Sequence, residues 1–316
     1  MFCILAKNSF FINGQQNLKC LKFILMPRSI KRPNSQPIQI PKKFKSQYLE
    51  LWSVNMPELP EVEILRQYVN DTSIRQIIEK VDVKDPRILE EISADGLANA
   101  LTGRQIQSTT RHGKLLFMKL EDDLWLALHL GMTGWLYYFR NMKAEPVHDR
   151  LLITFAGGAH LAYSDQRLFG RWTITKQPRL FVNEKRLGPD FLELSLSAFV
   201  ALMRRRRGFI KPALLDQHFI AGLGNLYSDE ALFQSGICPN AKLKCLSEDK
   251  LEYLFSNIRM ILQTAISSRM DIGSLPDSYL LAHRMPSGRC PKDGNPLMHK
   301  KIAGRTTYYC PRHQKM

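Results

Sequence analysis

The sequence predicts an α+β protein, and three parts of the chain indicate this class. From about residue 77 to 176, short apolar runs alternate with glycine-containing turns, a pattern typical of a β-sandwich or barrel. After LGPDFLEL (187–194), apolar residues recur at helical spacing. Residues 285–316 form a short basic tail with cysteine and histidine. We therefore expect a sheet region, a helical region and a small terminal module, in that order.

The sheet region follows an expected helix. Residues 57–70 alternate acids with apolar side chains at spacings that fit one helix, and Pro57 suits its first turn. The strands are expected at KLLFMKL (114–120), LWLALHL (124–130), WLYYF (135–139), RLLITF (150–155) and HLAYS (160–164).

The second region is expected to be helical. Ser247 is a good N-cap for the last of these helices, which has acids in its first turn. AGLGN (221–225) lies between two expected helices, and a helix, a short glycine turn and a second helix is the layout of many DNA-binding motifs. The helices are expected at SAFVALMRRRR (198–207), PALLDQH (212–218), NLYSDEALFQSG (225–236) and SEDKLEYLFSNIRMILQTAISS (247–268).

Charge and composition limit the classes of function. The chain has a formal net charge of +16 and a pI of about 9.7, which favours an anionic partner such as nucleic acid. A merely basic protein, or a ribosomal or RNA-binding role, is the alternative on charge alone. No apolar run approaches the roughly 18 residues that a bilayer span needs, so we expect a soluble protein. Six cysteines in 316 residues do not indicate a disulfide framework, and the reducing cytoplasm is the expected compartment.

Residues 1–55 form an extension without clean periodicity. The segment is basic, poor in acids and interrupted by prolines, a composition that resembles an organellar targeting peptide. The alternative, which we favour, is a disordered tail or a translated upstream region from a misplaced start.

Four residues of the tail have the spacing of a zinc site. Cys290 and Asp293 form one pair with two intervening residues, and Cys310 and His313 form another. Two such pairs can converge on one tetrahedral Zn²⁺, for which Asp is an accepted but weaker ligand than a thiolate. His299 is a possible substitute for Asp293. A hairpin without metal, held by small apolar contacts, is the alternative.

Three further stretches have residues suited to DNA. Gly222 and Gly224 permit close approach of the backbone to a phosphate, with Asn225 as a donor at the start of the next helix. Lys114 begins a strand after a basic turn. Arg167 and Phe169 share one loop and could fill a gap in a base stack. The alternative is a turn whose Phe169 covers the core.

Pro57 suggests covalent chemistry. A proline at a true N-terminus is a secondary amine, and an α-amino group with a pKa near 8 is partly neutral at physiological pH. A neutral amine can attack a sugar C1′ and form an iminium. Glu58 and Glu61 lie within one turn and can act as acid or base. The nitrogen of an internal proline is an amide, so this chemistry requires a chain that begins at Pro57.

These motifs resemble the formamidopyrimidine-DNA glycosylase/endonuclease VIII family, and the first motif resembles the formamidopyrimidine branch. The resemblance runs from Met56 to the C-terminus. It implies an extension at 1–55, a catalytic β-sandwich domain with an N-terminal helix at 56–180, a helix–two-turn–helix domain at 181–284 and a zinc-finger-like β-hairpin at 285–316. The motifs are PELPEVE (57–63), RHGK (111–114), HLGMTG (129–134), SDQRLFG (164–170), LGPD (187–190), IKPALLDQHFIAGLGNLYSDEALFQSGICP (210–239) and the tail from Cys290.

The resemblance also implies roles for individual residues. Pro57 matches the nucleophile, Glu58 the general acid that opens the deoxyribose, and Glu61 a glutamate that positions the helix. Lys114 and Asn225 match phosphate contacts, and Arg305 an arginine that holds the phosphate at the lesion. Met132, Arg167 and Phe169 match residues that fill the void left by the flipped base. His129 is expected to bind DNA, and Lys211 to support binding.

The activity that the resemblance implies is that of a DNA glycosylase and AP lyase, in which base removal is followed by β- and δ-elimination. The partner is double-stranded damaged DNA, the chain is expected to be a monomer, and zinc is the implied metal. Residues 267–289 are shorter than the loop that caps 8-oxoguanine in the bacterial family. This favours formamidopyrimidines, further-oxidised purines, oxidised pyrimidines and abasic sites. A non-catalytic protein that binds damaged DNA is the alternative function.

Overall fold

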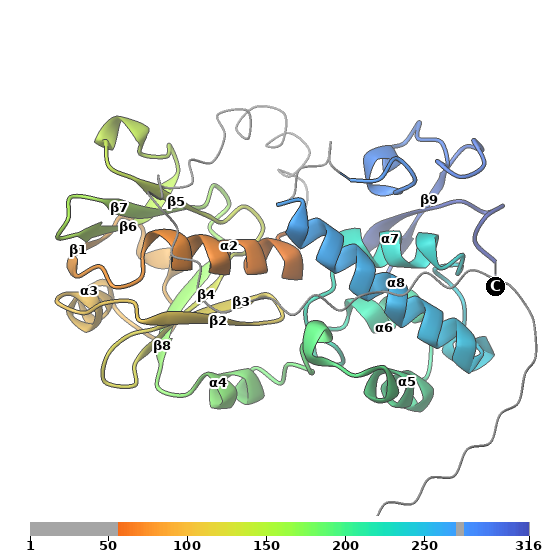
Figure 1. The fold of residues 1–316 in the computed structure, drawn as a ribbon, viewed down its shortest axis with the longest axis horizontal. Helices are drawn as coiled ribbons and strands as arrows, with labels where there is room; N and C mark the ends of the chain where they lie inside the picture. The colour runs from red at the N-terminus through yellow and green to blue at the C-terminus, as the bar shows by residue number, and fades with distance from the viewer. Residues whose placement is uncertain (1–55, 270–274, 316) are drawn as a thin grey trace, which may run out of the picture. The chain divides into compact units, whose positions relative to one another are not determined.

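Two four-stranded antiparallel sheets form the first region, and they lie one above the other in Figure 1. The structure is a computed structural model that describes residues 56–269 and 275–315, so the expectations for residues 1–55 lie outside the described residues. One sheet has the order β1 (Ile78–Val83), β6 (Asp149–Phe155), β7 (His160–Ser164), β5 (Trp135–Phe139). The other has the order β2 (Ser108–His112), β3 (Leu115–Lys119), β4 (Trp125–His129), β8 (Arg171–Thr175).

The first core lies between these sheets. Alternate residues of the strands supply it, together with one face of helix α2 (Leu59–Thr72) and of helix α3 (Ala94–Leu101). The expected strands are confirmed, and the expected sandwich or barrel is a sandwich. The expected helix at 57–70 is confirmed with one correction: α2 begins at Leu59 with Glu58 as N-cap, so Pro60, not Pro57, occupies its first turn.

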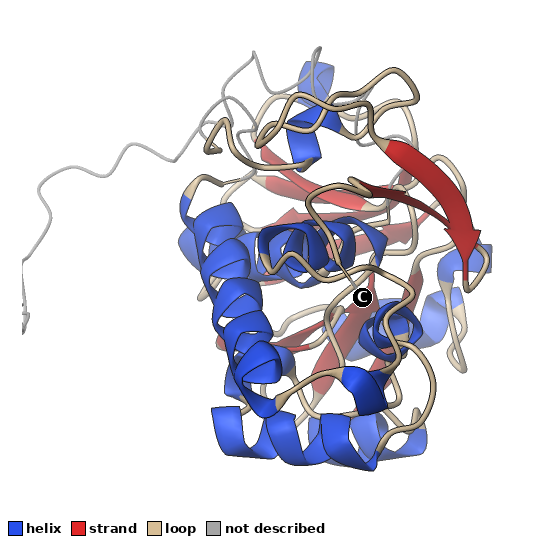
Figure 2. Cartoon of the chain, turned by 90° about the vertical axis from the view of Figure 1, so that its right-hand side faces the viewer, coloured by secondary structure: helices blue, strands red, loops and turns tan. Residues whose placement is uncertain are grey.

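The second region is helical, as expected. It contains α5 (Leu196–Arg205), α6 (Ile210–Leu215), α7 (Asn225–Gln234) and α8 (Glu248–Ser267), and helices are drawn in blue in Figure 2. Helix α4 (Pro178–Glu184) precedes this region, and its Phe181 packs against Leu115 and Phe117 of β3. Ser247 caps α8, because its Oγ accepts a hydrogen bond from the Lys250 N–H at 3.3 Å. The expected helix at 212–218 is instead α6, which ends at Leu215.

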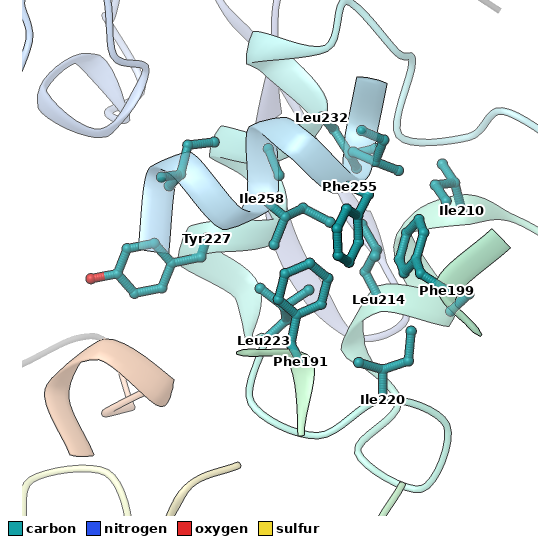
Figure 3. Close-up of a cluster of buried hydrophobic side chains, with 14 of the residues drawn as sticks. Phe191, Phe199, Ile210, Leu214, Ile220, Leu223, Tyr227, Leu232, Phe255 and Ile258 are labelled. Carbon is teal, nitrogen blue, oxygen red and sulfur yellow. The ribbon is translucent and has the colours of Figure 1, made fainter. Parts of the chain in front are cut away.

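A separate core holds the helices together. Phe191, Phe199 and Phe255 form a three-ring cluster with centroid separations of 5.3–5.9 Å, surrounded by aliphatic side chains from α6, α7 and α8 (Figure 3). Leu59 of α2 is also a member of this core. The start of α2 is therefore packed against the helical region, while the rest of α2 packs on the sandwich.

The C-terminal hairpin consists of β9 (Met298–Ile302) and β10 (Arg305–Tyr309). Its buried residues Cys290, Leu297 and Cys310 pack with Phe233 of α7 and with Leu280. The α+β class is thus confirmed. Within the described ranges, no helix has the length and apolar character needed to cross a membrane.

Candidate active site

Glu58 is enclosed by the turn that precedes α7. Its carboxylate accepts hydrogen bonds from the N–H groups of Gly224 at 2.6 Å, Leu226 at 2.8 Å and Tyr227 at 3.4 Å. These are free N–H groups at a helix start, where the helix dipole favours a negative charge. A Cβ at Gly224 would lie 2.4 Å from Glu58 Oε1. Only glycine allows this approach.

The other glycine of the turn has a similar role. Gly222 has a φ of +117°, and a Cβ there would lie 2.5 Å from Leu59 Cδ1. The Gly222 carbonyl accepts a hydrogen bond from the Leu59 N–H at 3.1 Å. We expected these glycines to admit a phosphate. In the structure they admit the start of α2, because residues 58 and 59 occupy the space where side chains would be, and a phosphate contact of this turn stays a prediction.

Burial sets the protonation of the acids. Desolvation raises the pKa of Glu58, opposed by Lys114 and by the three backbone N–H groups. Burial, and then the charge of Glu58, raise the pKa of Glu61 to about 7. Glu61 Oε2 accepts from the Glu58 N–H at 2.7 Å, and its Oε1 accepts from the Tyr227 hydroxyl at 2.7 Å. Next to Pro57, the chain therefore holds a carboxyl group that retains its proton more readily than an exposed glutamate.

We expect the free energy of unfolding to fall as pH rises from about 4.5 to about 7. Burial raises the pKa of both Glu61 and Glu230 from 4.5 to about 7. The folded chain thus binds these protons more tightly than the unfolded chain does. The contribution of Glu61 and Glu230 to the free energy of unfolding is fully present below about pH 4.5 and is lost as the pH rises through about 7. In Glu61→Gln the amide oxygen can accept from the Glu58 N–H while the NH2 donates to the Tyr227 hydroxyl oxygen. Urea unfolding of this variant should show a smaller fall, and an unchanged pH dependence would refute this assignment.

Lys114 lies on a turn that is fixed to the helical region. Burial lowers its pKa, opposed by the charges of Glu58 and Glu61. The preceding Gly113 has a φ of +55°, and its N–H donates to Asp190 Oδ2 at 2.6 Å. Arg111 pairs with the same carboxylate, which is fully buried. Asp190 was not singled out from the sequence, although it lies in the LGPD motif.

His129 is half-buried on β4. It pairs in register with Leu115 of β3 and Arg171 of β8. Burial, and then the nearby charges of Lys114 and Arg171, lower its pKa to about 4. Lys114, His129 and Arg171 line one cavity of about 270 Å³. His129 is therefore neutral at pH 7 and can meet DNA as an uncharged hydrogen-bonding group.

Met132, Arg167 and Phe169 lie on two neighbouring loops. Phe169 is 48% exposed, and the Arg167 guanidinium lies 5.0 Å from the centre of its ring. The alternative that Phe169 covers the core is therefore wrong. An exposed aromatic ring with a cation against it is suited to contact with bases.

The Lys211 side chain is fully buried and is not exposed on the protein surface. Its ammonium pairs with Asp229, and it donates to Asn225 Oδ1 at 2.8 Å and to the Thr307 hydroxyl. Both charged side chains of the pair are fully enclosed. Lys211 thus joins α6, α7 and the hairpin, and a supporting role in DNA binding, through Asn225, stays a prediction. Asn225 also donates to the Thr306 carbonyl at 2.9 Å, beside the exposed Arg305.

The predicted metal ligands come together only in part. One ligand atom each from Cys290, Asp293 and Cys310 lie within 4.8 Å of one another. His313 is outside this group, because its Nε2 lies 2.7 Å from the Phe233 carbonyl oxygen. His299 is outside it too, and its ring lies 5.6 Å from that of Tyr308. Two thiols and a carboxyl group are donors that fit a metal such as zinc.

The arrangement of these acidic, basic and aromatic residues is that of an enzyme that acts on DNA. A carboxyl group of altered pKa lies beside a buried lysine, while exposed arginines and an aromatic ring occupy neighbouring loops. Comparison with known proteins specifies the class further. The chain belongs to the formamidopyrimidine-DNA glycosylase family: residues 56–172 match the model of the formamidopyrimidine-DNA glycosylase N-terminal domain, and residues 187–275 match that of its H2TH domain.

Individual relatives agree. The formamidopyrimidine-DNA glycosylase of Heliobacterium modesticaldum is 34% identical over 277 residues, which cover 82% of this chain and 100% of the relative. The formamidopyrimidine-DNA glycosylase of Pelotomaculum thermopropionicum is 34% identical over 275 residues, which cover 83% of this chain and 100% of the relative. Among solved structures, the Lactococcus lactis Fpg in complex with abasic-site DNA has a TM-score of 0.74 at 31% identity. The match covers 82% of this chain and 100% of that chain. A complex of that protein with FAPY-dG DNA has a TM-score of 0.73.

Proposed function

We propose that this chain is a DNA glycosylase of base excision repair that removes oxidised bases from double-stranded DNA and then nicks the strand. The observation that supports this most strongly is the enclosure of Glu58. Its carboxyl group is held by three backbone N–H groups beside Pro57, and burial raises its pKa. Formamidopyrimidines, further-oxidised purines and oxidised pyrimidines are the proposed lesions. This choice of lesions follows from the short segment at 267–289, of which residues 270–274 lie outside the described residues.

The proposed reaction begins at a free Pro57 nitrogen. Its lone pair attacks C1′, and the bond from C1′ to the damaged base breaks, with the electron pair leaving on the base. The proton that the Pro57 nitrogen loses balances the proton that the departing base gains. Glu58 gives its proton to the ring oxygen O4′, which opens the sugar and leaves an iminium between Pro57 and C1′. The iminium acidifies the C2′ hydrogen. Loss of that proton expels the 3′ phosphate, a second elimination expels the 5′ phosphate, and water then releases Pro57.

The remaining site residues are proposed to bind DNA. Lys114, His129, Asn225 and Arg305 would contact phosphates around the lesion. Met132, Arg167 and Phe169 would fill the space left by the flipped nucleotide. The domain limits proposed for these roles are 56–180, 181–284 and 285–316, after an extension at 1–55. DNA as partner makes the cytoplasm, at the nucleoid, the proposed compartment.

We expect residues 57–316 to cleave a duplex that contains one formamidopyrimidine and to leave the same duplex without the lesion intact. Both phosphate ends should appear, because β- and δ-elimination remove the sugar. Gel analysis of end-labelled strands measures this. Glu58→Gln should retain duplex binding and lose about a hundredfold or more in cleavage rate, because it has no carboxyl proton to transfer. Tight, lesion-specific binding without any cleavage by the unsubstituted chain would instead support the non-catalytic DNA-binding protein.

We propose zinc as the metal, held by Cys290, Asp293 and Cys310. When bound, zinc supplies a structural crosslink between the two ends of the hairpin region. We expect about one zinc per chain by elemental mass spectrometry. Asp293→Ala should lower the zinc content, whereas His313→Ala should retain it, because the His313 ring is directed to the Phe233 carbonyl. Equal zinc loss in both variants would show that His313 is a ligand, and zinc-free active protein would refute the site.

A further inference from the structure

The buried carboxylate of Asp165 joins the two loops that carry Met132, Arg167 and Phe169. Asp165 has no exposed surface. Its Oδ1 accepts from the Thr133 hydroxyl and from the Arg167 N–H at 3.2 Å. Its Oδ2 accepts from the Gly170 N–H at 2.8 Å and lies 3.2 Å from the Tyr163 hydroxyl. These donors come from both loops.

The Asp165 carboxylate accepts hydrogen bonds only from uncharged groups of the described residues. Among the described residues, no lysine, arginine or histidine side chain forms an ion pair with its carboxylate. A buried carboxylate is strongly unfavourable unless hydrogen bonds replace the lost water. The loops must therefore keep the positions in which their donors meet it, so the carboxylate restricts both loops at once.

Thr133 provides the link between the loops. Its hydroxyl donates to Asp165 Oδ1 and accepts from the Arg167 N–H at 3.1 Å. Met132 is the residue before Thr133, and Arg167 is two residues after Asp165. Leu168, between Arg167 and Phe169, has a φ of +59°, a conformation that a leucine rarely adopts without outside support. Arg171 donates to the Leu168 carbonyl at 3.0 Å and so supplies part of that support.

The backbones of the two loops are also in direct contact. A Cβ at Gly131 would lie 2.4 Å from the Gly170 nitrogen, and a Cβ at Gly170 would lie 1.6 Å from the Tyr163 hydroxyl oxygen. The Tyr163 hydroxyl in turn lies 3.1 Å from the Leu130 carbonyl oxygen, at the start of the first loop. The loops thus meet through backbone at Gly131 and Gly170 and through the Tyr163 hydroxyl, so a change in one loop moves the other.

We propose that Asp165 and Thr133 are positioning residues that make these two loops a single preformed wedge. The inference rests on the proposed function, in which Met132, Arg167 and Phe169 enter the duplex. A wedge whose backbone is already ordered loses less conformational entropy when it enters DNA than a mobile loop does. Loss of the link would therefore slow reactions that need wedge insertion and spare those that do not.

A matched pair of variants in residues 57–316 tests this. Thr133→Val keeps the shape and removes the hydroxyl, whereas Thr133→Ser keeps the hydroxyl. One readout is borohydride trapping on an abasic site in a duplex and in single-stranded DNA, which has no stack to open. The other is the fluorescence of 2-aminopurine placed opposite a non-cleavable abasic analogue, which reports wedge insertion without chemistry.

We expect Thr133→Val to lose about tenfold or more in duplex trapping and in the fluorescence change, in line with one buried unsatisfied group. Thr133→Ser should restore both, and single-strand trapping should be equal in all three proteins. Asp165→Asn, which places a donor against donors, should repeat the duplex defect. Duplex values unchanged in Thr133→Val, or an equal loss on single strands, would overturn the proposal. Absence of trapping by the unsubstituted chain would instead contradict the proposed function, while the fluorescence would still measure the wedge.

Discussion

Borohydride is expected to trap residues 57–316 covalently on lesion-containing DNA and to leave the 1–316 chain untrapped. In the longer chain the Pro57 nitrogen is an amide that links it to Met56, and an amide has no lone pair available for attack on C1′. Removal of an enzyme's nucleophile commonly lowers turnover by a thousandfold or more, so we expect a loss of at least about a thousandfold.

Two controls sharpen this prediction. The Pro57→Gly chain begins with a primary amine, so the amount of trapped adduct should be smaller than with Pro57, or no adduct should form. Mass spectrometry of the trapped peptide should place the DNA on residue 57. The mechanism is excluded if cellular protein with an acylated Pro57 nicks lesion DNA at the rate of the 57–316 chain.

Asp229→Asn is expected to lower the free energy of unfolding by about 3–5 kcal/mol, because it leaves the Lys211 ammonium buried without its counter-ion. Asp229 also accepts from Arg284 Nε at 3.0 Å and from the Tyr308 N–H at 3.2 Å, so the same change weakens attachment of the hairpin. Urea unfolding measures the loss.

The matched control is Asp122→Asn. Asp122 is 78% exposed in its side chain and pairs with Arg104 at 3.3 Å, and exposed pairs contribute less than about 1 kcal/mol. The double variant Lys211→Met/Asp229→Leu should recover part of the stability, because it removes the two fully buried charges together but still leaves Arg284 without its carboxylate partner. A loss for Asp229→Asn no larger than that for Asp122→Asn would show that the pair is not the link between α7 and the hairpin.

The hairpin region is therefore held by an internal group and by contacts with α7. The internal group is formed by Cys290, Asp293 and Cys310. One of the contacts with α7 is made by Asp229, which reaches β10 through Tyr308 and Lys211. Because Arg305 lies at the start of β10, its position depends on Asp229 as well as on any metal.

The sequence by itself determined the secondary structure and the residues with chemical promise. Short apolar runs separated by glycine-containing turns predicted five strands of the sandwich, and Ser247 with its following acids predicted the start of α8. These features depend on side chains within a few positions of one another, so a linear pattern contains them. The motifs likewise identified Pro57, Glu58 and Lys114, because their value lies in their own functional groups.

Only the tertiary structure decided which partner each polar group meets. Gly224 faces Glu58, which precedes it by 166 residues, and Lys211 donates to Thr307, which follows it by 96 residues. Such pairs are set by how the sandwich, the helices and the hairpin pack. No local periodicity records them, and this is why the sequence did not indicate that the glycine turn receives the start of α2, that Lys211 is paired inside the protein, or that the His313 ring lies against the Phe233 carbonyl. The carboxylates of Asp165, Asp190 and Asp229 were overlooked for the same reason: each became important only when folding buried it among donors from distant segments.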